Sequence, residues 1–144
     1  MTEDKVTKLI ELAKNSYEDA QRNKSKITND WRIMDQLCVS SKRFKNLLNN
    51  LCSMDNCCYL ELGCFRGGTL CAALFKNKPL VAYAIDNFQY DPLSLYTNPE
   101  TGERSSVNPD GWANVKITLI DNLERFALDK TVKLFVGEIG RAHV

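Results

Sequence analysis

Two acidic residues, Glu61 and Asp86, flank a glycine-rich segment that is the part of the chain best suited to hold a ligand. The segment contains Gly63, Gly67 and Gly68, which let the backbone turn sharply and leave no side chain between it and a bound molecule. Asp86 follows the glycines by about 20 residues, the usual distance for a carboxylate that accepts hydrogen bonds from a ribose diol. These residues predict a nucleoside-binding site.

The residues around the first glycine indicate the charge of the ligand. A dinucleotide fingerprint requires G-x-G-x-x-G, but Phe65 occupies the second glycine position and Glu61 precedes Gly63 by two residues. A carboxylate at this place suits the sulfonium and ammonium groups of S-adenosylmethionine better than a pyrophosphate. Arg66, in the same segment, could reach a ligand carboxylate or could simply be solvated, as arginines in surface turns usually are.

Secondary structure must bring these residues together. An apolar run at 57–62 precedes the glycines, apolar positions with helical spacing follow at 70–74, and a second apolar run at 80–85 ends on Asp86. This order predicts a βαβ unit, in which ligands bind beyond the carboxyl ends of the parallel strands. Thr69 lies where a cap of the helix is expected, and it could also donate a hydrogen bond to the ligand.

The motif Glu61-Leu62-Gly63-Cys64-Phe65-Arg66-Gly67-Gly68-Thr69 resembles motif I of the class I S-adenosylmethionine-dependent methyltransferases, and Tyr83-Ala84-Ile85-Asp86-Asn87 resembles motif II. The doubled glycine before Thr69 is similar to that of macrocin-type and related small-molecule O-methyltransferases. The resemblance covers about residues 44–137. It implies a Rossmann-like, doubly wound parallel α/β sheet, with S-adenosylmethionine as cofactor and methyl transfer to an oxygen of a small molecule or sugar.

The resemblance assigns cofactor binding to a group of residues around the glycines. It assigns no catalytic base and no metal ligand. The alternatives are an NAD-dependent oxidoreductase and a non-catalytic Rossmann-like binding module. The assigned cofactor-binding residues are Glu61, Gly63, Gly67, Gly68, Thr69, Asp86 and Asn87.

Three helices are expected before the first strand. The first covers residues 4–22 with an amphipathic pattern, and it should cover the sheet or a partner subunit, which would make the protein a homo-oligomer. A short helix is expected from a cap at Asn29 or Asp30 to Leu37. The third begins at a cap provided by Ser40 or Ser41, and packing in the core explains its apolar residues. These are Phe44, Leu47, Leu48 and Leu51.

The chain after Asp86 is less regular. Residues 87–113 are rich in Pro, Gly, Asn and Ser, and this predicts either a lid or acceptor-binding loop or a disordered insertion. The apolar spacing that follows predicts a helix, and residues 131–136 predict a third strand. The helix is carried by Ile117, Ile120, Leu123, Phe126 and Ala127. The family sheet has seven strands, so the resemblance implies an N-terminal half only, with about three strands and a truncated C-terminus.

The sequence divides into three parts. Residues 1–39 form an N-terminal helical extension, and residues 40–137 form the partial S-adenosylmethionine-binding domain, with its long loop at 87–113. Residues 138–144 match the translation of a common sequencing adapter, so we expect this tail to be non-native. His143, the only histidine, therefore should not serve as a catalytic base.

Composition and charge give no support to several kinds of partner. The chain has 144 residues and a formal net charge of +1 with both signs mixed along it, so neither nucleic acid nor a membrane surface is indicated as a partner. The absence of a signal-like or membrane-spanning apolar run predicts a cytoplasmic location. The six cysteines include no C-x-x-C pair, which favours buried thiols over a zinc site. Cys64 alone lies in the ligand loop, where a thiol can be accessible.

Overall fold

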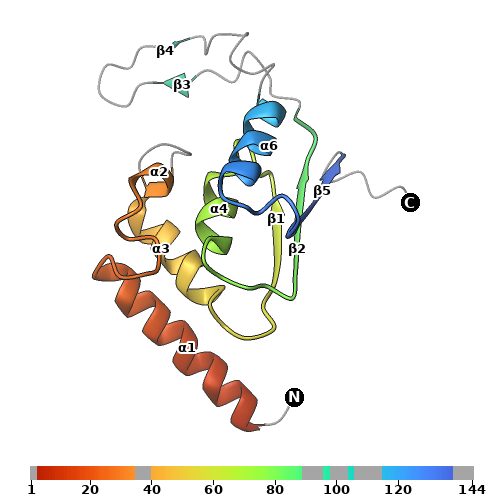
Figure 1. Cartoon of the computed structure of the whole chain (residues 1–144). Coiled ribbons are helices and arrows are strands. Elements are labelled where there is room, and N and C mark those ends of the chain that lie inside the picture. Colours follow the sequence, from red (N-terminus) through yellow and green to blue (C-terminus); the bar gives the residue numbers. More distant parts are fainter. Residues whose placement is uncertain (1–2, 35–39, 89–95, 98–103, 106–114, 138–144) are drawn as a thin grey trace.

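The computed structural model describes residues 3–34, 40–88, 96–97, 104–105 and 115–137 (Figure 1). Three features expected from the sequence lie outside these ranges: the end of the second helix near Leu37, most of the segment 87–113, and the tail at 138–144. Within the described ranges, no helix combines the length and the apolar character needed to cross a lipid bilayer.

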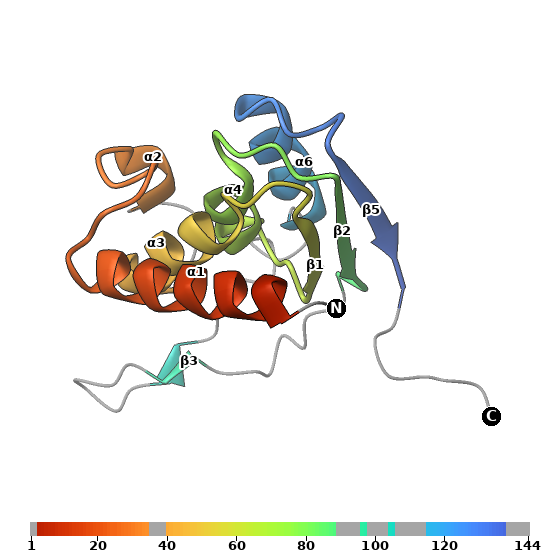
Figure 2. The same ribbon diagram turned by 90° about the horizontal axis from the view of Figure 1, so that it is seen from below.

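The centre of the structure is an open sheet of three parallel strands, as the sequence predicts. The strands are β1 (Cys58–Leu62), β2 (Val81–Asp86) and β5 (Val132–Val136), in the spatial order β1-β2-β5. Helix α4 (Gly68–Leu74) connects β1 to β2, and helix α6 (Val115–Arg125) precedes β5. Both crossovers step in the same direction across the sheet, so the right-handed rule places both helices on the same face, where Figures 1 and 2 show them.

The hydrophobic core lies between that face and the helices. Leu70 and Leu74 of α4 and Leu119 of α6 are fully buried, and they pack in one cluster with Ala82 and Ala84 of β2. On the opposite face, Leu60, Leu62 and Phe135 are each more than half exposed, because no described element covers them. The protein is therefore a mixed α/β fold whose sheet is covered on one face only in the part of the chain described.

The three N-terminal helices are present. They are α1 (Glu3–Gln21), α2 (Trp31–Met34) and α3 (Lys42–Leu51). Helix α1 packs mainly on α3, and α3 packs on α4, so α1 is the outermost helix (Figure 2). The expectation that α1 covers the sheet is therefore wrong. Its Ile10 and Tyr17 are exposed, and pairing of two copies through this helix stays a prediction.

Side chains cap two of these helices as predicted. Asp30 Oδ1 accepts a hydrogen bond from the backbone N–H of Arg32 at 3.2 Å, at the start of α2. Ser41 Oγ accepts from the N–H of Phe44 at 3.2 Å, at the start of α3. Both satisfy donors that the first turn of a helix leaves unpaired.

Helix α3 buries polar side chains beside its apolar ones, and the sequence-based expectation fails at one residue. Leu48 packs against the core as expected, and Leu47 and Leu51 are half-buried. Phe44 is 47% exposed, whereas Lys45, Asn46 and Asn49 are buried. Lys45 Nζ donates to the carbonyls of Ile33 and Met34, each at 2.9 Å. Lys45 and Asn49 thus serve backbone groups of other segments that need hydrogen-bond partners there.

Helix α6 forms where the sequence predicts a helix, and it is buried on one side only. Ile117 and Ile120 are exposed, whereas Val115 and Leu119 are fully buried and Leu123 is nearly so.

The segment expected to be irregular contains a short antiparallel pair, β3 (Tyr96–Thr97) with β4 (Arg104–Ser105). The choice between a lid and a disordered insertion concerns residues that lie mostly outside the described ranges.

Candidate functional site

A glycine loop at the carboxyl end of β1 forms the candidate site. Gly63 (φ +77°) and Gly67 (φ +79°) both adopt the left-handed conformation that favours glycine. The N–H of Gly63 donates to the carbonyl of Ile85 at 2.9 Å, which ties the start of the loop to β2. Gly68 is buried as the first residue of α4. The loop therefore turns between two strands and a helix, as the motif predicts.

The two left-handed glycines differ in what surrounds them. A Cβ atom built on Gly67 would overlap Cδ1 of Leu119, a fully buried side chain of α6. A Cβ atom built on Gly63 would meet nothing within 4 Å. Gly67 is thus required by packing, whereas Gly63 borders open space beside the loop.

Asp86 binds the loop directly. Its carboxylate is only 3% exposed; Oδ2 accepts from the N–H of Phe65 and Oδ1 from the N–H of Phe88, both at 2.8 Å. Asn87 follows directly and is half-buried. The structure therefore gives Asp86 a role that the sequence did not suggest, which is to hold the loop against the end of β2.

Glu61 joins β1 to the helix after the loop. Its Oε2 accepts from the hydroxyl of Tyr59 at 2.7 Å, and its Oε1 accepts from the hydroxyl of Thr69. Burial raises the pKa of the Glu61 carboxyl, and these two hydrogen bonds oppose that shift. The N-cap of α4 is Gly67, with no side-chain cap, so the prediction that Thr69 caps this helix is wrong; its hydroxyl bonds Glu61 instead.

The thiol in the loop is not accessible, contrary to expectation. Cys64 is 2% exposed. Burial raises its pKa to about 12, and the nearby charges of Asp86 and Glu61 add to the shift. A thiol in such surroundings is not a nucleophile at neutral pH.

Arg66 is the loop residue with an unsatisfied group. Its Nε is buried and has no hydrogen-bond partner among the described residues, and its guanidinium lies 5.1 Å from the centroid of the Phe65 ring. Its carbonyl accepts from Nδ2 of Asn122 at 2.9 Å. The sequence left the role of Arg66 open, because the burial of one nitrogen depends on how the loop folds.

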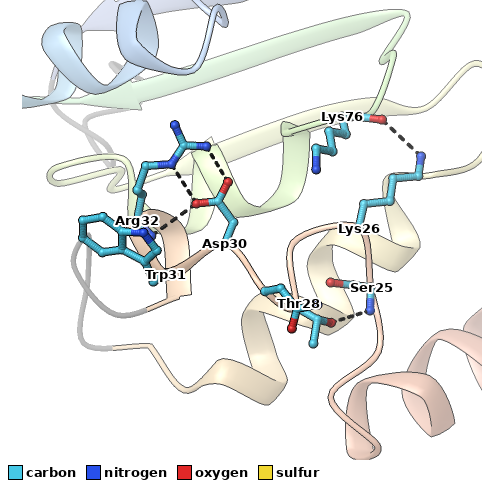
Figure 3. Close-up of a pocket in the computed structure, with 8 residues that line it drawn as sticks. Ser25, Lys26, Thr28, Asp30, Trp31, Arg32 and Lys76 are labelled. Atoms are coloured by element: carbon cyan, nitrogen blue, oxygen red, sulfur yellow. Dashed lines mark hydrogen bonds and ion pairs between the residues drawn. The ribbon is translucent and has the colours of Figure 1, made fainter.

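A separate hollow of about 470 Å³ lies near the other end of α4 (Figure 3). Lys26 and Lys76 line it, together with an ion pair in which Arg32 donates to both oxygens of Asp30 at 2.9 and 2.6 Å. Both lysines are exposed. Behind the lining, the buried Asn46 accepts from the hydroxyls of Ser25 and Thr28 with its Oδ1, and its Nδ2 has no partner among the described residues. The glycine loop, with its left-handed glycines and its two carboxylates, is the better-defined candidate for a ligand site.

Metal binding has no support in the part of the chain that the structure describes. No group of three or more His, Cys, Asp or Glu side chains there could hold an ion. Comparison with known proteins adds no assignment, because no family model, no curated protein and no solved structure matches the chain.

Proposed function

We propose that this chain is the cofactor-binding part of an S-adenosylmethionine-dependent methyltransferase that transfers a methyl group to an oxygen of a small molecule or sugar. One observation carries the proposal. Two carboxylates on adjacent parallel strands converge on one glycine loop, with Asp86 bonded to the loop backbone and Glu61 bonded to Thr69 of the helix that follows. This is the end of a parallel sheet at which such folds bind ligands.

The contacts within the loop favour this cofactor over a dinucleotide. In dinucleotide-binding loops, the second glycine lets the backbone approach the pyrophosphate closely. Here Phe65 occupies that position, and its N–H already donates to Asp86 at 2.8 Å. The buried carboxylate of Asp86 and the half-buried one of Glu61 would also repel a pyrophosphate, whereas they attract a sulfonium and an ammonium group.

The residues present fit the cofactor. Asp86 accepts from two backbone N–H groups at the carboxyl end of β2, where such folds bind a ribose, and Gly63 leaves open space beside the loop. Glu61 places negative charge near the loop, so binding of a cation would favour its ionised form. The bound cofactor supplies an electrophilic methyl group. The chain's own contribution is to bind and orient it, since no described residue stands out as a general base.

Calorimetric titration tests the proposal. We expect S-adenosylhomocysteine to bind and NAD not to bind. Binding of NAD alone would support the oxidoreductase, and binding of neither would support a non-catalytic module; either result would overturn the proposal.

A substitution at Asp86 tests the site itself. Asp86→Ala should weaken binding of S-adenosylhomocysteine roughly 10- to 100-fold, since hydrogen bonds to a charged acceptor contribute about 1.5–3 kcal/mol. The control is Asp121→Ala, which removes an exposed carboxylate of α6 and should leave the affinity unchanged. Because Asp86 also holds the loop, melting curves of both variants should accompany the titrations. Unchanged affinity in Asp86→Ala would remove Asp86 from the site.

A further inference from the structure

The first half of helix α1 is exposed along its whole length. Every residue from 3 to 11 is exposed, and the buried residues of the helix are Ser16 and Ala20, in the half that packs on α3. Figure 1 shows the first half extending past α3 toward the N-terminus. A helix in water gains most of its stability from packing of its apolar face. The exposed half of α1 is therefore a surface whose burial by a partner would stabilise it.

An apolar stripe runs along this exposed surface. Its members recur at steps of one, three or four residues, so they lie within about 100° of the helix circumference. They are Val6, Leu9, Ile10, Ala13 and Tyr17. The exposed fraction is 40% for Leu9, 51% for Ile10 and 56% for Tyr17. The opposite side of the helix is polar and contains an ion pair between Lys8 and Asp4 at 2.8 Å. Only the apolar side would therefore gain from being covered.

Two charged side chains of opposite sign, Glu3 and Lys14, flank the stripe on the same side. They are separated by about three helical turns, or about 16 Å along the axis. Neither takes part in an ion pair among the described residues. If a second copy of the helix lies antiparallel on the first, the acidic end of one meets the basic end of the other. The surface is thus complementary to itself, as a two-fold interface requires.

We infer that a second copy of this chain binds to α1, with the two helices antiparallel about a two-fold axis near Leu9. Glu3 then lies opposite Lys14 of the partner subunit, and the symmetry repeats this pair at the other end of the interface. The two apolar stripes cover each other between these pairs. A second copy fits this surface better than a membrane or a nucleic acid, because α1 has more acidic than basic residues. The inference does not depend on the proposed function.

Sedimentation equilibrium of the full chain tests the interface. We expect a monomer–dimer equilibrium over micromolar to submillimolar concentrations. Leu9→Glu places like charges opposite each other at the axis, so it should raise the dissociation constant at least roughly 30-fold. The control is Leu60→Glu, which makes the same change on the uncovered face of the sheet, where Leu60 is 57% exposed. This control should leave the dissociation constant unchanged.

A charge swap tests the antiparallel arrangement. Glu3→Lys and Lys14→Glu should each raise the dissociation constant roughly 2- to 30-fold, since each replaces two exposed ion pairs by like charges. The double variant restores both pairs and should return the dissociation constant to that of the unmodified chain. Asp4→Lys makes the same change as Glu3→Lys in the same turn, but on the polar side of the helix, and should have no effect.

Three results would overturn the inference. The first is a monomer at every concentration. The second is a dimer that Leu60→Glu dissociates and Leu9→Glu does not, because the uncovered face of the sheet would then be the interface. The third is a double charge variant that dimerises no better than the single variants, which would exclude the antiparallel arrangement. Melting curves at a concentration where every variant is monomeric should coincide, since Leu9, Glu3 and Lys14 are all exposed.

Discussion

Substitution of Gly67 gives the sharpest test of how the loop is built. Gly67→Ala places a Cβ atom on a residue with φ +79°, where an L-residue costs about 1–2 kcal/mol. The same atom would overlap Leu119, which is fully buried and cannot move aside without disturbing the core. Overpacking of this kind costs about 1–3 kcal/mol. We therefore expect Gly67→Ala to lower the free energy of unfolding by roughly 2–5 kcal/mol.

Gly63→Ala is the matched control. Gly63 has nearly the same backbone conformation, with φ +77°, but an added Cβ meets nothing within 4 Å. In this variant the free energy of unfolding should fall only by the cost of the left-handed backbone conformation, about 1–2 kcal/mol. Because the Cβ enters the open space beside the loop, Gly63→Ala should weaken binding of S-adenosylhomocysteine more than it destabilises the fold.

Urea denaturation of the two variants measures the difference directly. A third comparison separates the strain of the backbone at Gly67 from the overlap with Leu119. Leu119→Ala should lower the free energy of unfolding less in the Gly67→Ala variant than in the unmodified chain, because truncating Leu119 removes the overlap. If Gly67→Ala and Gly63→Ala destabilise the protein equally, α6 does not pack against the loop as described. The steric reasoning would then be refuted.

Three further predictions concern buried polar groups. Glu61 has a pKa raised above its ordinary value of 4.5, so the folded state binds the proton more tightly. The stability that this gives is present at low pH and is lost as pH rises through the raised pKa. Urea titrations from pH 4 to 8 should therefore show the free energy of unfolding of the unmodified chain falling relative to that of Glu61→Gln. A difference between the two proteins that does not change with pH would contradict this. Lys45→Met should lower the free energy of unfolding by about 1–3 kcal/mol, because it leaves two carbonyls unpaired. Lys14 is exposed, so Lys14→Met should leave the free energy of unfolding unchanged in the same assay. Iodoacetamide at pH 8 should label the exposed Cys58 of the folded protein and leave Cys64 unmodified, as read by peptide mass spectrometry; equal labelling would mean that the loop opens.

The sequence predicted the elements whose signals are local. Apolar runs bounded by turn residues located β1, β2 and β5, and the side-chain caps Asp30 and Ser41 located the starts of two helices. The glycine spacing located the loop. These features depend on neighbouring residues along the chain, so they can be recognised without knowing the fold.

The sequence did not predict that α3 buries polar side chains. The apolar stripe of α3 suggested that Phe44 is buried, yet Lys45, Asn46 and Asn49 are the buried residues. Asn49 Nδ2 donates to the carbonyls of Ala72 and Phe75 at 2.8 and 3.0 Å, at the end of α4. Its partners are more than 20 residues away, so no local pattern could have revealed this face.

The same division applies to the candidate site. The sequence identified Glu61 and Asp86 as the carboxylates beside a glycine loop, because their types and spacing are visible in the chain. Only the tertiary structure decided that both bond the protein itself, and that Arg66 is left with an unpartnered nitrogen. Residue types set which hydrogen bonds a site can make. The folded protein uses some of these hydrogen bonds itself, and which ones it uses depends on contacts between segments that only folding brings together.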